Sequence, residues 1–307
     1  MVVNGRTGRP TVLLTSNVGP IDAPALVSTY ETTIDEELLD EIEFFMPIYT
    51  GPAVNLALMR RMPNLAVCQL LSAGYESALA FLPEGVTLCN AGGVHDASTA
   101  ELAIGLIIAS LRGIDDAARD MAAGRWDHRT RPALADCHVV VVGAGGVGRA
   151  IQRRLAPFET TVTMVGRTGR PGVRAASELV GLLPTAEVVV LALPLDSTTE
   201  RSVDASFLAA MKDGALLVNV ARGRVVDTDA LLIELASGRL RAAMDVTDPE
   251  PLPADHPLWL QQGALITPHV GGNTSAFLPR ARRLIERQVN AFLAGNDLES
   301  VVVLSGS

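Results

Sequence analysis

Lysine and cysteine are scarce in this sequence, and their scarcity removes several chemistries. Lys212 is the only lysine among 25 basic residues, so Schiff-base chemistry has a single candidate nucleophile. None of the three tyrosines has a lysine four positions on, which excludes the Tyr-x-x-x-Lys pair of short-chain dehydrogenases. The three cysteines form no CxxC pair, so we expect buried thiols in a reducing compartment rather than disulfides or zinc ligands.

Positive charge and long apolar runs are also missing. The net charge of −9 disfavours nucleic acid and anionic membranes as partners. The first residues lack the apolar core of a secretory signal, and the longest apolar run, 102–111, has about half of the ~20 residues that a membrane span needs. The sequence therefore predicts a cytoplasmic protein.

The run at 102–111, LAIGLIIASL, is apolar on every side rather than along one stripe. A helix of this kind is buried all round. Two arrangements satisfy this condition: a contact helix between two subunits of a dimer, or an internal core helix. We expect the dimer contact and keep the core helix as the alternative.

Length and composition predict two globular domains. Of the 307 residues, 48% are apolar and 19% charged, which excludes a disordered chain. From about residue 136, short Val- and Leu-rich runs alternate with helical segments, as in a parallel sheet covered on both faces. The expected strands are 138–142, 161–165, 188–193, 215–220, 242–246 and 265–267. The predicted fold class is α/β.

The first 90 residues repeat the pattern on a smaller scale, with expected strands at 11–14, 44–49, 66–70 and 86–89. Segment 275–293 carries one mostly apolar stripe at helical spacing, which predicts a final helix with its arginines in solvent. The pattern alone assigns this helix to neither domain.

A glycine-rich turn follows the first strand of the second half. Gly143, Gly145 and Gly148 form G-x-G-x-x-G between an expected strand and an expected helix. Such glycines permit a tight turn and close backbone approach, and the amino end of the helix receives the pyrophosphate of a dinucleotide. In this context we favour a dinucleotide site over an ordinary glycine-rich turn.

The next strand ends without an acidic residue. Gly166 occupies that place, and Arg167, Thr168 and Arg170 follow. A carboxylate would accept a hydrogen bond from the ribose 2′-hydroxyl of NAD(H), whereas arginine donates charge-assisted bonds to the 2′-phosphate of NADP(H). The sequence therefore favours NADP(H) over NAD(H), with an exposed arginine turn as the alternative.

Four polar residues follow the later strands. Arg222 lies in NVARG, Asp245 and Glu250 in MDVTDPEPLP, and His269 in TPHVGG. Because ligands collect at the carboxyl ends of parallel strands, we expect Arg222, Asp245 and His269 to converge. Each residue also has a plainer interpretation: a surface ion pair for Arg222, a loop charge for Glu250 and a capped core histidine for His269.

These residue types suit the reduction of a 2-oxo acid. His269 can protonate the carbonyl oxygen, Glu250 can orient the ring and favour its charged form, and Arg222 can bind the substrate carboxylate. A serine hydrolase is disfavoured because the G-x-S-x-G elbow is missing. The five histidines never fall at ligand spacing, so we expect no metal.

The segments NVARG, MDVTDPEPLP and TPHVGG, in this order, resemble the D-isomer-specific 2-hydroxyacid dehydrogenases. The similarity runs from about residue 64 to about residue 274. The Gly-Arg after the second strand and the DPEPLP loop are most similar to NADP-dependent glyoxylate/hydroxypyruvate reductases.

This resemblance implies two Rossmann-like domains with parallel sheets and an active site in the cleft between them. Residues 1–96, completed by 275–307, would form the substrate-binding domain, and residues 97–274 the dinucleotide-binding domain. A homodimer through the helix at 102–111 is implied as well. The substrate would be a small 2-oxo acid.

Individual roles also follow from the resemblance. It implies that Arg222 binds the substrate, that His269 is the acid/base and that Glu250 is its partner. The implied cofactor contacts are Gly146, Val147, Leu193, Pro194, Val220, Ala221 and Asp245. The implied substrate contacts are Tyr49, Ala73 and Gly74.

Two other functions remain as alternatives. A nucleotide-sensing, corepressor-like binding protein would use the same fold to present a partner surface, but long extensions that recruit partners are missing. A β-hydroxyacid dehydrogenase would have its glycine loop near residue 10 and a lysine on a late helix, and neither is found.

Overall fold

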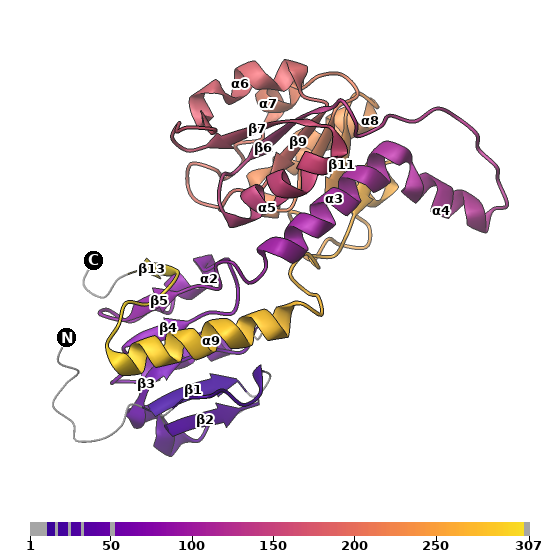
Figure 1. Cartoon of the computed structure of the whole chain (residues 1–307). Coiled ribbons are helices and arrows are strands. Elements are labelled where there is room, and N and C mark those ends of the chain that lie inside the picture. The colour runs from indigo at the N-terminus through magenta and orange to yellow at the C-terminus, as the bar shows by residue number, and fades with distance from the viewer. Residues whose placement is uncertain (1–10, 16–17, 24–25, 32–33, 50–52, 304–307) are drawn as a thin grey trace. The chain divides into compact units, whose positions relative to one another are not determined.

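The computed structural model describes residues 11–15, 18–23, 26–31, 34–49 and 53–303. The chain divides into two compact units: a first unit of residues 1–95 and 275–307, and a second unit of residues 96–274. Each unit contains one sheet of mainly parallel strands with helices packed against it (Figure 1). The predicted α/β class with two parallel sheets is therefore confirmed.

The sheet of the second unit has seven parallel strands in the order β12-β11-β10-β9-β6-β7-β8. Their bounds are β6 (His138–Val142), β7 (Thr161–Gly166), β8 (Arg174–Ala175), β9 (Val188–Leu191), β10 (Leu216–Asn219), β11 (Arg241–Met244) and β12 (Ala264–Ile266). The chain reverses its direction of winding between β6 and β9, and ligands bind outside the carboxyl ends of strands at such a point. The sequence predicted six of these strands; β8, with two residues, is too short to show a pattern.

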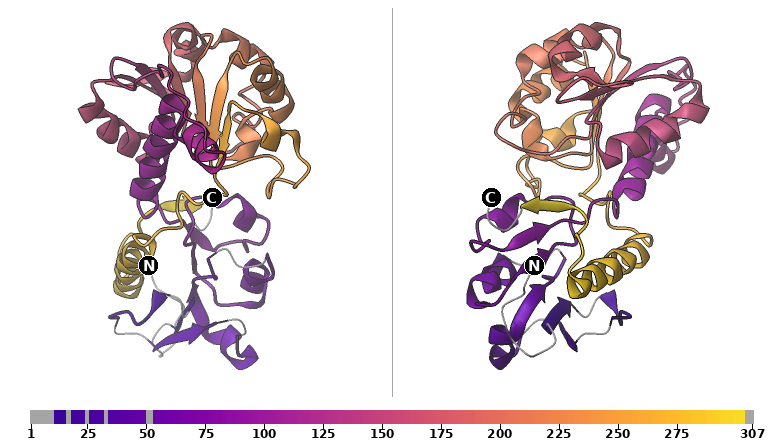
Figure 2. Two further views of the ribbon diagram at one scale, coloured as in Figure 1. Left: turned by 90° about the vertical axis from the view of Figure 1, so that its right-hand side faces the viewer. Right: turned by 60° about the vertical axis from the view of Figure 1, so that its left-hand side comes forward.

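Helices cover both faces of this sheet. Helices α3 (Asp96–Arg112) and α5 (Gly146–Leu155) pack on one face, and α6 (Leu179–Leu182), α7 (Ala205–Ala210) and α8 (Thr228–Ala236) pack on the other (Figure 2). Alternate residues of β6 enter the two cores: Val139 and Val141 face α3 and α5, while Val140 and Val142 face the opposite side. Because both faces are buried, the strands are apolar throughout, as their sequences indicate.

Helix α3 contains the apolar run at 102–111 and packs against α5, β10 and β11 within the second unit. Ala103 and Ile107 are fully buried there, so one side of the run belongs to the core of the second unit, as the alternative of an internal core helix requires. On the other side Gly105 is exposed, and Leu102 and Ile108 are half-buried. The predicted dimer contact on that side stays a prediction.

No single helix in the described ranges has both the length and the hydropathy of a membrane span. Helices α3 and α4 (Ile114–Ala122) have the required length and hydropathy only as a pair, and the chain bends by 66° between them.

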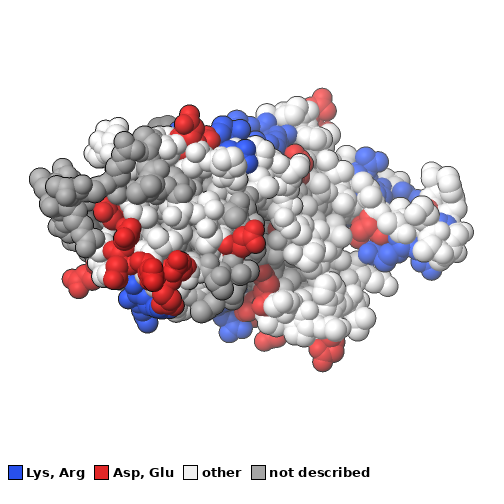
Figure 3. All heavy atoms as spheres, turned by 90° about the horizontal axis from the view of Figure 1, so that it is seen from below, with Lys and Arg blue, Asp and Glu red and all other residues white. Residues whose placement is uncertain are grey.

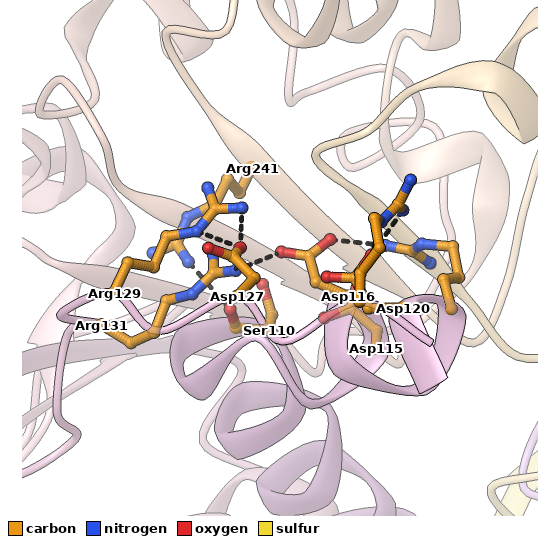
Figure 4. Close-up of polar contacts among 10 residues, drawn as sticks. Ser110, Asp115, Asp116, Asp120, Asp127, Arg129, Arg131 and Arg241 are labelled. Carbon is orange, nitrogen blue, oxygen red and sulfur yellow. Dashed lines mark hydrogen bonds and ion pairs between the residues drawn. The ribbon is translucent and has the colours of Figure 1, made fainter. Parts of the chain in front are cut away.

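Residues 113–133, which we call the arm, extend from the end of α3 and include α4 (Figure 1). Gly113 has φ +62°, a conformation that favours glycine, and a Cβ on it would lie 2.6 Å from Cζ of Arg131, so a side chain there would have to displace this guanidinium. Arg131 also pairs with Asp116 at 2.8 Å (Figure 4). Met121 and Trp126 are 80% and 93% exposed. The arm therefore turns back on itself through ion pairs, and the sequence analysis did not predict it.

Among the described residues of the first unit, six strands form a sheet in the order β13-β5-β4-β3-β1-β2, and only β13 of these is antiparallel to its neighbour. The strand bounds are β1 (Thr11–Thr15), β2 (Leu26–Tyr30), β3 (Ile42–Phe45), β4 (Val67–Gln69), β5 (Thr87–Cys89) and β13 (Val301–Val303). The helices are α1 (Ala53–Ala57), α2 (Glu76–Leu79) and α9 (Phe277–Ala294). The two edge strands, β2 and β13, were not predicted from the sequence.

Helix α9 covers one face of this sheet with the stripe that the sequence predicts. Ala281, Leu284, Ile285 and Val289 are buried against β1, β3 and β4 (Figure 2). Arg282, Arg283 and Arg287 of this helix are exposed, as expected, and Nε of Arg282 also donates to the carbonyl oxygen of Val18 at 2.9 Å. The chain thus returns to the first unit through a long, well-buried helix.

Acidic side chains gather on the face drawn in Figure 3, while basic side chains lie in smaller, separate groups among the described residues. The 3-10 helix η2 (Glu36–Glu41) contains four acidic residues within six positions, Glu36, Glu37, Asp40 and Glu41. This distribution agrees with the net charge of −9.

Candidate active site

The glycine-rich turn between β6 and α5 leaves no room for side chains at two of its glycines. Gly143 has φ +116°, and a Cβ on it would lie 2.1 Å from the carbonyl oxygen of Ala192 at the end of β9. A Cβ on Gly148 would lie 1.8 Å from the carbonyl oxygen of Gly143. Gly145 and Gly146 are exposed at the amino end of α5. The turn thus fits a dinucleotide, which needs an accessible backbone at a helix amino end.

An acidic side chain lies against this turn. A Cβ on Gly146 would lie 2.0 Å from Oδ2 of Asp96, the first residue of α3. The partial positive charge at the amino end of α5 favours a carboxylate there, but it favours a pyrophosphate for the same reason. Asp96 was not among the residues singled out from the sequence.

Two arginines hold the carbonyl oxygen of Ala144 in the middle of the turn. Nε of Arg149 donates to it at 3.2 Å and Nη2 of Arg170 at 3.1 Å. Arg170, which the sequence assigns to the cofactor, is therefore tied to the glycine turn. Arg149 and Arg170 fix the peptide plane from two different elements.

The other two residues expected around a 2′-phosphate, Arg167 and Thr168, are exposed beyond β7. Nη2 of Arg167 donates to Oδ2 of Asp196 at 2.5 Å. Asp196 belongs to the loop after β9, so this ion pair joins the two loops that flank the glycine turn.

The cofactor contacts implied along β9 and β10 lie at the carboxyl ends of those strands. Leu193 is half-buried and Pro194 exposed after β9, whereas Val220 and Ala221 are buried after β10. Val147, in the first turn of α5, is half-buried. All of them lie at the edge of the sheet that carries the glycine turn.

His269 and Glu250 are brought into direct contact. Nδ1 of His269 lies 2.5 Å from Oε1 of Glu250, and the two side chains are 49% and 41% exposed. An ionised carboxylate only accepts, so Nδ1 carries the proton in this pair and Nε2 is left for a ligand. The described residues hold no group of three or more His, Cys, Asp or Glu placed to bind a metal.

Asp245 organises the loop that carries His269. This carboxylate is 3% exposed, and it accepts from the hydroxyl of Thr267 at 2.6 Å and from the amides of Val270 and Gly271 at 2.9 and 2.8 Å. His269 itself has φ +52°, a left-handed conformation that costs a non-glycine residue about 1 kcal/mol. The bonds to Asp245 offset that cost. A cofactor contact of Asp245 stays a prediction.

Arg222 follows β10, next to the strand that leads to Glu250. The two loops touch closely, because a Cβ on Gly223 would lie 1.8 Å from the carbonyl oxygen of Thr247. Nη1 of Arg222 donates to the carbonyl oxygen of Ala221 at 2.7 Å. Since β10, β11 and β12 are parallel neighbours, Arg222, Glu250 and His269 lie on successive loops at one edge of the sheet.

In the first unit, residues 72–74 form a pinned loop. The carbonyl oxygen of Ser72 accepts from the amide of Ala91 at 2.8 Å, and that of Ala73 accepts from Nδ2 of Asn90 at 2.7 Å. In a trans peptide the amide points away from the preceding carbonyl. The amides of Ala73 and Gly74 are therefore turned away from these internal partners, as a site for an anion requires.

Tyr49, the remaining residue implied for the substrate, packs against two rings of the first unit that also stack on each other, with 5.2 Å between their centroids. Its ring centroid lies 5.6 Å from that of His95 and 4.6 Å from that of Phe277. Nε2 of His95 lies 2.7 Å from the carbonyl oxygen of Leu71, directly before the pinned loop. Tyr49 thus belongs to an aromatic cluster that supports this loop.

Comparison with known families identifies the second unit. The family model described as "D-isomer specific 2-hydroxyacid dehydrogenase, NAD binding domain" matches residues 104–271, which is more than half of the chain. The chain belongs to the D-isomer specific 2-hydroxyacid dehydrogenases. This dehydrogenase is therefore an NAD(P)-dependent oxidoreductase, as the sequence motifs predict, and its matched residues lie wholly within the second unit.

Two curated relatives support this assignment. The dehydrogenase is 33% identical over 256 residues to the glyoxylate reductase/hydroxypyruvate reductase of Homo sapiens, covering 78% of each chain. It is 31% identical over 259 residues to the glyoxylate reductase of Thermofilum pendens, covering 79% of this chain and 76% of that one.

A solved structure shows the same fold. The D-isomer specific 2-hydroxyacid dehydrogenase from Xanthobacter autotrophicus Py2, in complex with NADPH and MES, is 26% identical with a TM-score of 0.80. The match covers 95% of this dehydrogenase and 98% of that chain.

Proposed function

We propose that this dehydrogenase transfers a hydride between NADP(H) and a small 2-oxo or 2-hydroxy acid of the glyoxylate/hydroxypyruvate type. The curated relatives with this activity in their names support the substrate class. The related structure in complex with NADPH supports the cofactor, as does the turn with Arg167, Thr168 and Arg170, where a carboxylate would favour NAD(H). In this proposal the second unit binds the dinucleotide and the first unit binds the substrate.

The contact between His269 and Glu250 carries the proposal. When bound, the nicotinamide supplies the hydride that reduces the carbonyl carbon. His269 donates a proton from Nε2 to the carbonyl oxygen, and it takes this proton back in the reverse direction. Glu250 accepts from Nδ1, which fixes the ring and stabilises the imidazolium that is present before proton transfer.

Arg222 binds the substrate carboxylate and polarises the carbonyl group, because a guanidinium matches a carboxylate with two parallel hydrogen bonds. The amides of Ala73 and Gly74 serve the same carboxylate, and Tyr49 shapes the pocket for the substrate side chain. On the cofactor side, Gly143, Gly145, Gly146, Val147 and Gly148 receive the pyrophosphate. Leu193, Pro194, Val220, Ala221 and Asp245 contact the rest of the dinucleotide.

We also propose a cytoplasmic homodimer that associates through the exposed side of α3. The three cysteines are free and buried, as predicted, which suits a reducing compartment. A nucleotide-sensing binding protein is not favoured, because the curated relatives reported above are named as reductases.

The test is the oxidation of NADPH in the presence of a panel of small 2-oxo acids. We expect turnover of glyoxylate and hydroxypyruvate. Tight NADPH binding without turnover of any member of the panel would refute the proposal. Arg222→Ala should lose about 100-fold or more in activity with nearly unchanged NADPH affinity, whereas Arg224→Ala, two residues on and paired with Glu200, serves as the matched control.

A further inference from the structure

Asp196 is bound to Arg167, one of the cations that we assign to the 2′-phosphate of NADP(H). Arg167 is an exposed cation of the turn after β7, with 74% of its side chain accessible, and Oδ2 of Asp196 already accepts from its Nη2 at 2.5 Å. The partner comes from the loop after β9, 29 residues further along the chain. The cation that we assign to NADP(H) is therefore already paired with an internal anion.

The carboxylate of Asp196 is held in place independently of Arg167. Its Oδ1 accepts from the amide and the hydroxyl of Thr198 at 2.8 and 2.6 Å, and from the amide of Thr199 at 3.1 Å. These hydrogen bonds, led by the Thr198 hydroxyl, hold the pKa of Asp196 below its ordinary value, so the group is charged at neutral pH. Asp196 is thus a fixed negative charge, and the exposed Arg167 is its partner.

Two consequences follow for a phosphate that approaches Arg167. If Arg167 keeps its bond to Asp196, a phosphate on the same guanidinium lies within roughly 7 Å of a like charge. If Arg167 leaves Asp196, binding must first break the ion pair, and the intrinsic association constant is multiplied by the fraction of molecules in which Arg167 is free. Either route weakens binding of the 2′-phosphate and leaves NAD(H), which lacks this group, untouched.

We propose that Asp196 is a specificity-determining residue that competes with the 2′-phosphate of NADP(H) for Arg167 and so limits the preference for NADP(H). This inference rests on the proposed NADP(H) preference. Asp196 lies in the loop after β9, whereas the acidic residue that usually sets cofactor preference is sought at the end of β7.

Asp196→Asn is the informative variant, because the amide oxygen of asparagine can keep the bonds to Thr198 and Thr199 while the charge is removed. We expect the dissociation constant of NADPH to fall about three- to tenfold, and that of NADH to change less than about twofold. Asp213→Asn is the matched control, since Asp213 is an exposed carboxylate paired with Arg239 that precedes β10 at the opposite edge of the sheet. It should change neither constant.

Titrations of the full-length protein with NADPH and NADH separate the possible outcomes. If the native protein binds NADPH no better than NADH, the proposed cofactor preference itself fails. If the native protein prefers NADPH and Asp196→Asn leaves the ratio unchanged, only the role of Asp196 is refuted. Weaker NADPH binding in Asp196→Asn would mean that Asp196 positions Arg167, and weaker NADH binding would make it a ribose ligand; both would overturn the inference.

A double mutant tests whether the effect passes through Arg167. In an Arg167→Ala background, Asp196→Asn should lose most of its effect on NADPH binding, because the guanidinium for which Asp196 and the phosphate compete is no longer present. An equally large gain in that background would show that Asp196 acts on the phosphate without Arg167 and would refute competition for Arg167.

Discussion

The amide of His269 donates to the carbonyl oxygen of Asp245 at 2.8 Å, and the carboxylate of the same aspartate holds Thr267, Val270 and Gly271 around it. The residue proposed as acid/base therefore sits on a loop whose shape depends on one buried carboxylate. Asp245 acts on both sides of His269. The left-handed backbone of His269 is stable only inside this network.

Removing that carboxylate should damage both the fold and the activity. Asp245→Ala leaves three donors of the loop without their acceptor, so we expect a loss of about 2–4 kcal/mol in the free energy of unfolding. Activity should fall further than stability explains, because His269 loses its position. Urea unfolding and kcat, measured on the same preparations, give both quantities; a fully active Asp245→Ala enzyme would show that the loop keeps its shape without Asp245.

Asp96 gives a prediction for both cofactors at once. Its carboxylate lies against Gly146, where the proposal places the pyrophosphate that NADPH and NADH share. Asp96→Asn should therefore lower the dissociation constants of both by about two- to fivefold, with their ratio unchanged. Unlike Asp196→Asn, it should not alter cofactor preference, and a change in the ratio would contradict this placement. Thermal unfolding of the variant checks that α3 still forms.

The arm should loosen in acid. Burial acts to raise the pKa of Asp116, but hydrogen bonds from Arg119 and Arg131 outweigh it and hold that pKa below its ordinary value. A carboxyl with a lowered pKa in the folded state stabilises it above its ordinary pKa, and this contribution is lost as the pH falls through the lowered value. We expect amide exchange in residues 113–133, corrected for its intrinsic pH dependence, to quicken up to about fivefold as the pH is taken below the ordinary pKa of an aspartate.

Arg131→Ala should show the faster exchange of the arm already at neutral pH and respond less to acid. Arg125→Ala is the control. Arg125 follows α4 and pairs with Asp120 of that helix, so its ion pair is local and does not involve Asp116. Equal exchange in the native protein and Arg131→Ala at neutral pH would contradict the role given to Arg131 (Figure 4).

The buried cysteines should resist thiol reagents in the native protein. Burial raises the pKa of Cys89 to about 11, against a hydrogen bond with Gln288 that lowers it, and burial raises the pKa of Cys68 further. Both thiols therefore stay protonated at about pH 8. Titration with a disulfide reagent should detect less than one thiol per native chain and three after denaturation. Rapid native labelling would contradict the burial.

These raised pKa values also predict lower stability in alkali. An unfolded thiol ionises at its ordinary pKa, whereas the folded thiol stays protonated up to its raised pKa. The free energy of unfolding therefore falls as the pH rises from the ordinary pKa toward the raised one. Urea midpoints measured across this range should fall, and they should fall less in Cys89→Ala.

Much of the second unit could be predicted because its strands and its glycine turn are each encoded in a short segment of sequence. The strands of the second unit are continuous apolar runs, and the G-x-G-x-x-G turn follows one of them, so β6 and α5 were readable from periodicity. The resemblance to the D-isomer specific 2-hydroxyacid dehydrogenases implied in advance that Glu250 is the partner of His269. The structure adds the contact distance of 2.5 Å.

The features that were missed depend on contacts between distant residues. The edge strand β13 has three residues and exists only through pairing with β5, about 212 positions earlier in the chain. The arm has no apolar core, and its shape rests on ion pairs such as Asp116 with Arg131. The pairing of Arg167 with Asp196 joins two loops, and nothing in either segment alone indicates it.

The central claim is that His269, oriented by Glu250, is the acid/base of hydride transfer to a 2-oxo acid. The most direct measurement compares kcat for glyoxylate reduction and NADPH affinity in His269→Ala, with His128→Ala, an exposed histidine of the arm, as control. The account predicts that His269→Ala loses about 100- to 10,000-fold in kcat while its NADPH dissociation constant changes less than about twofold. A His269→Ala enzyme that is as active as the control would contradict it.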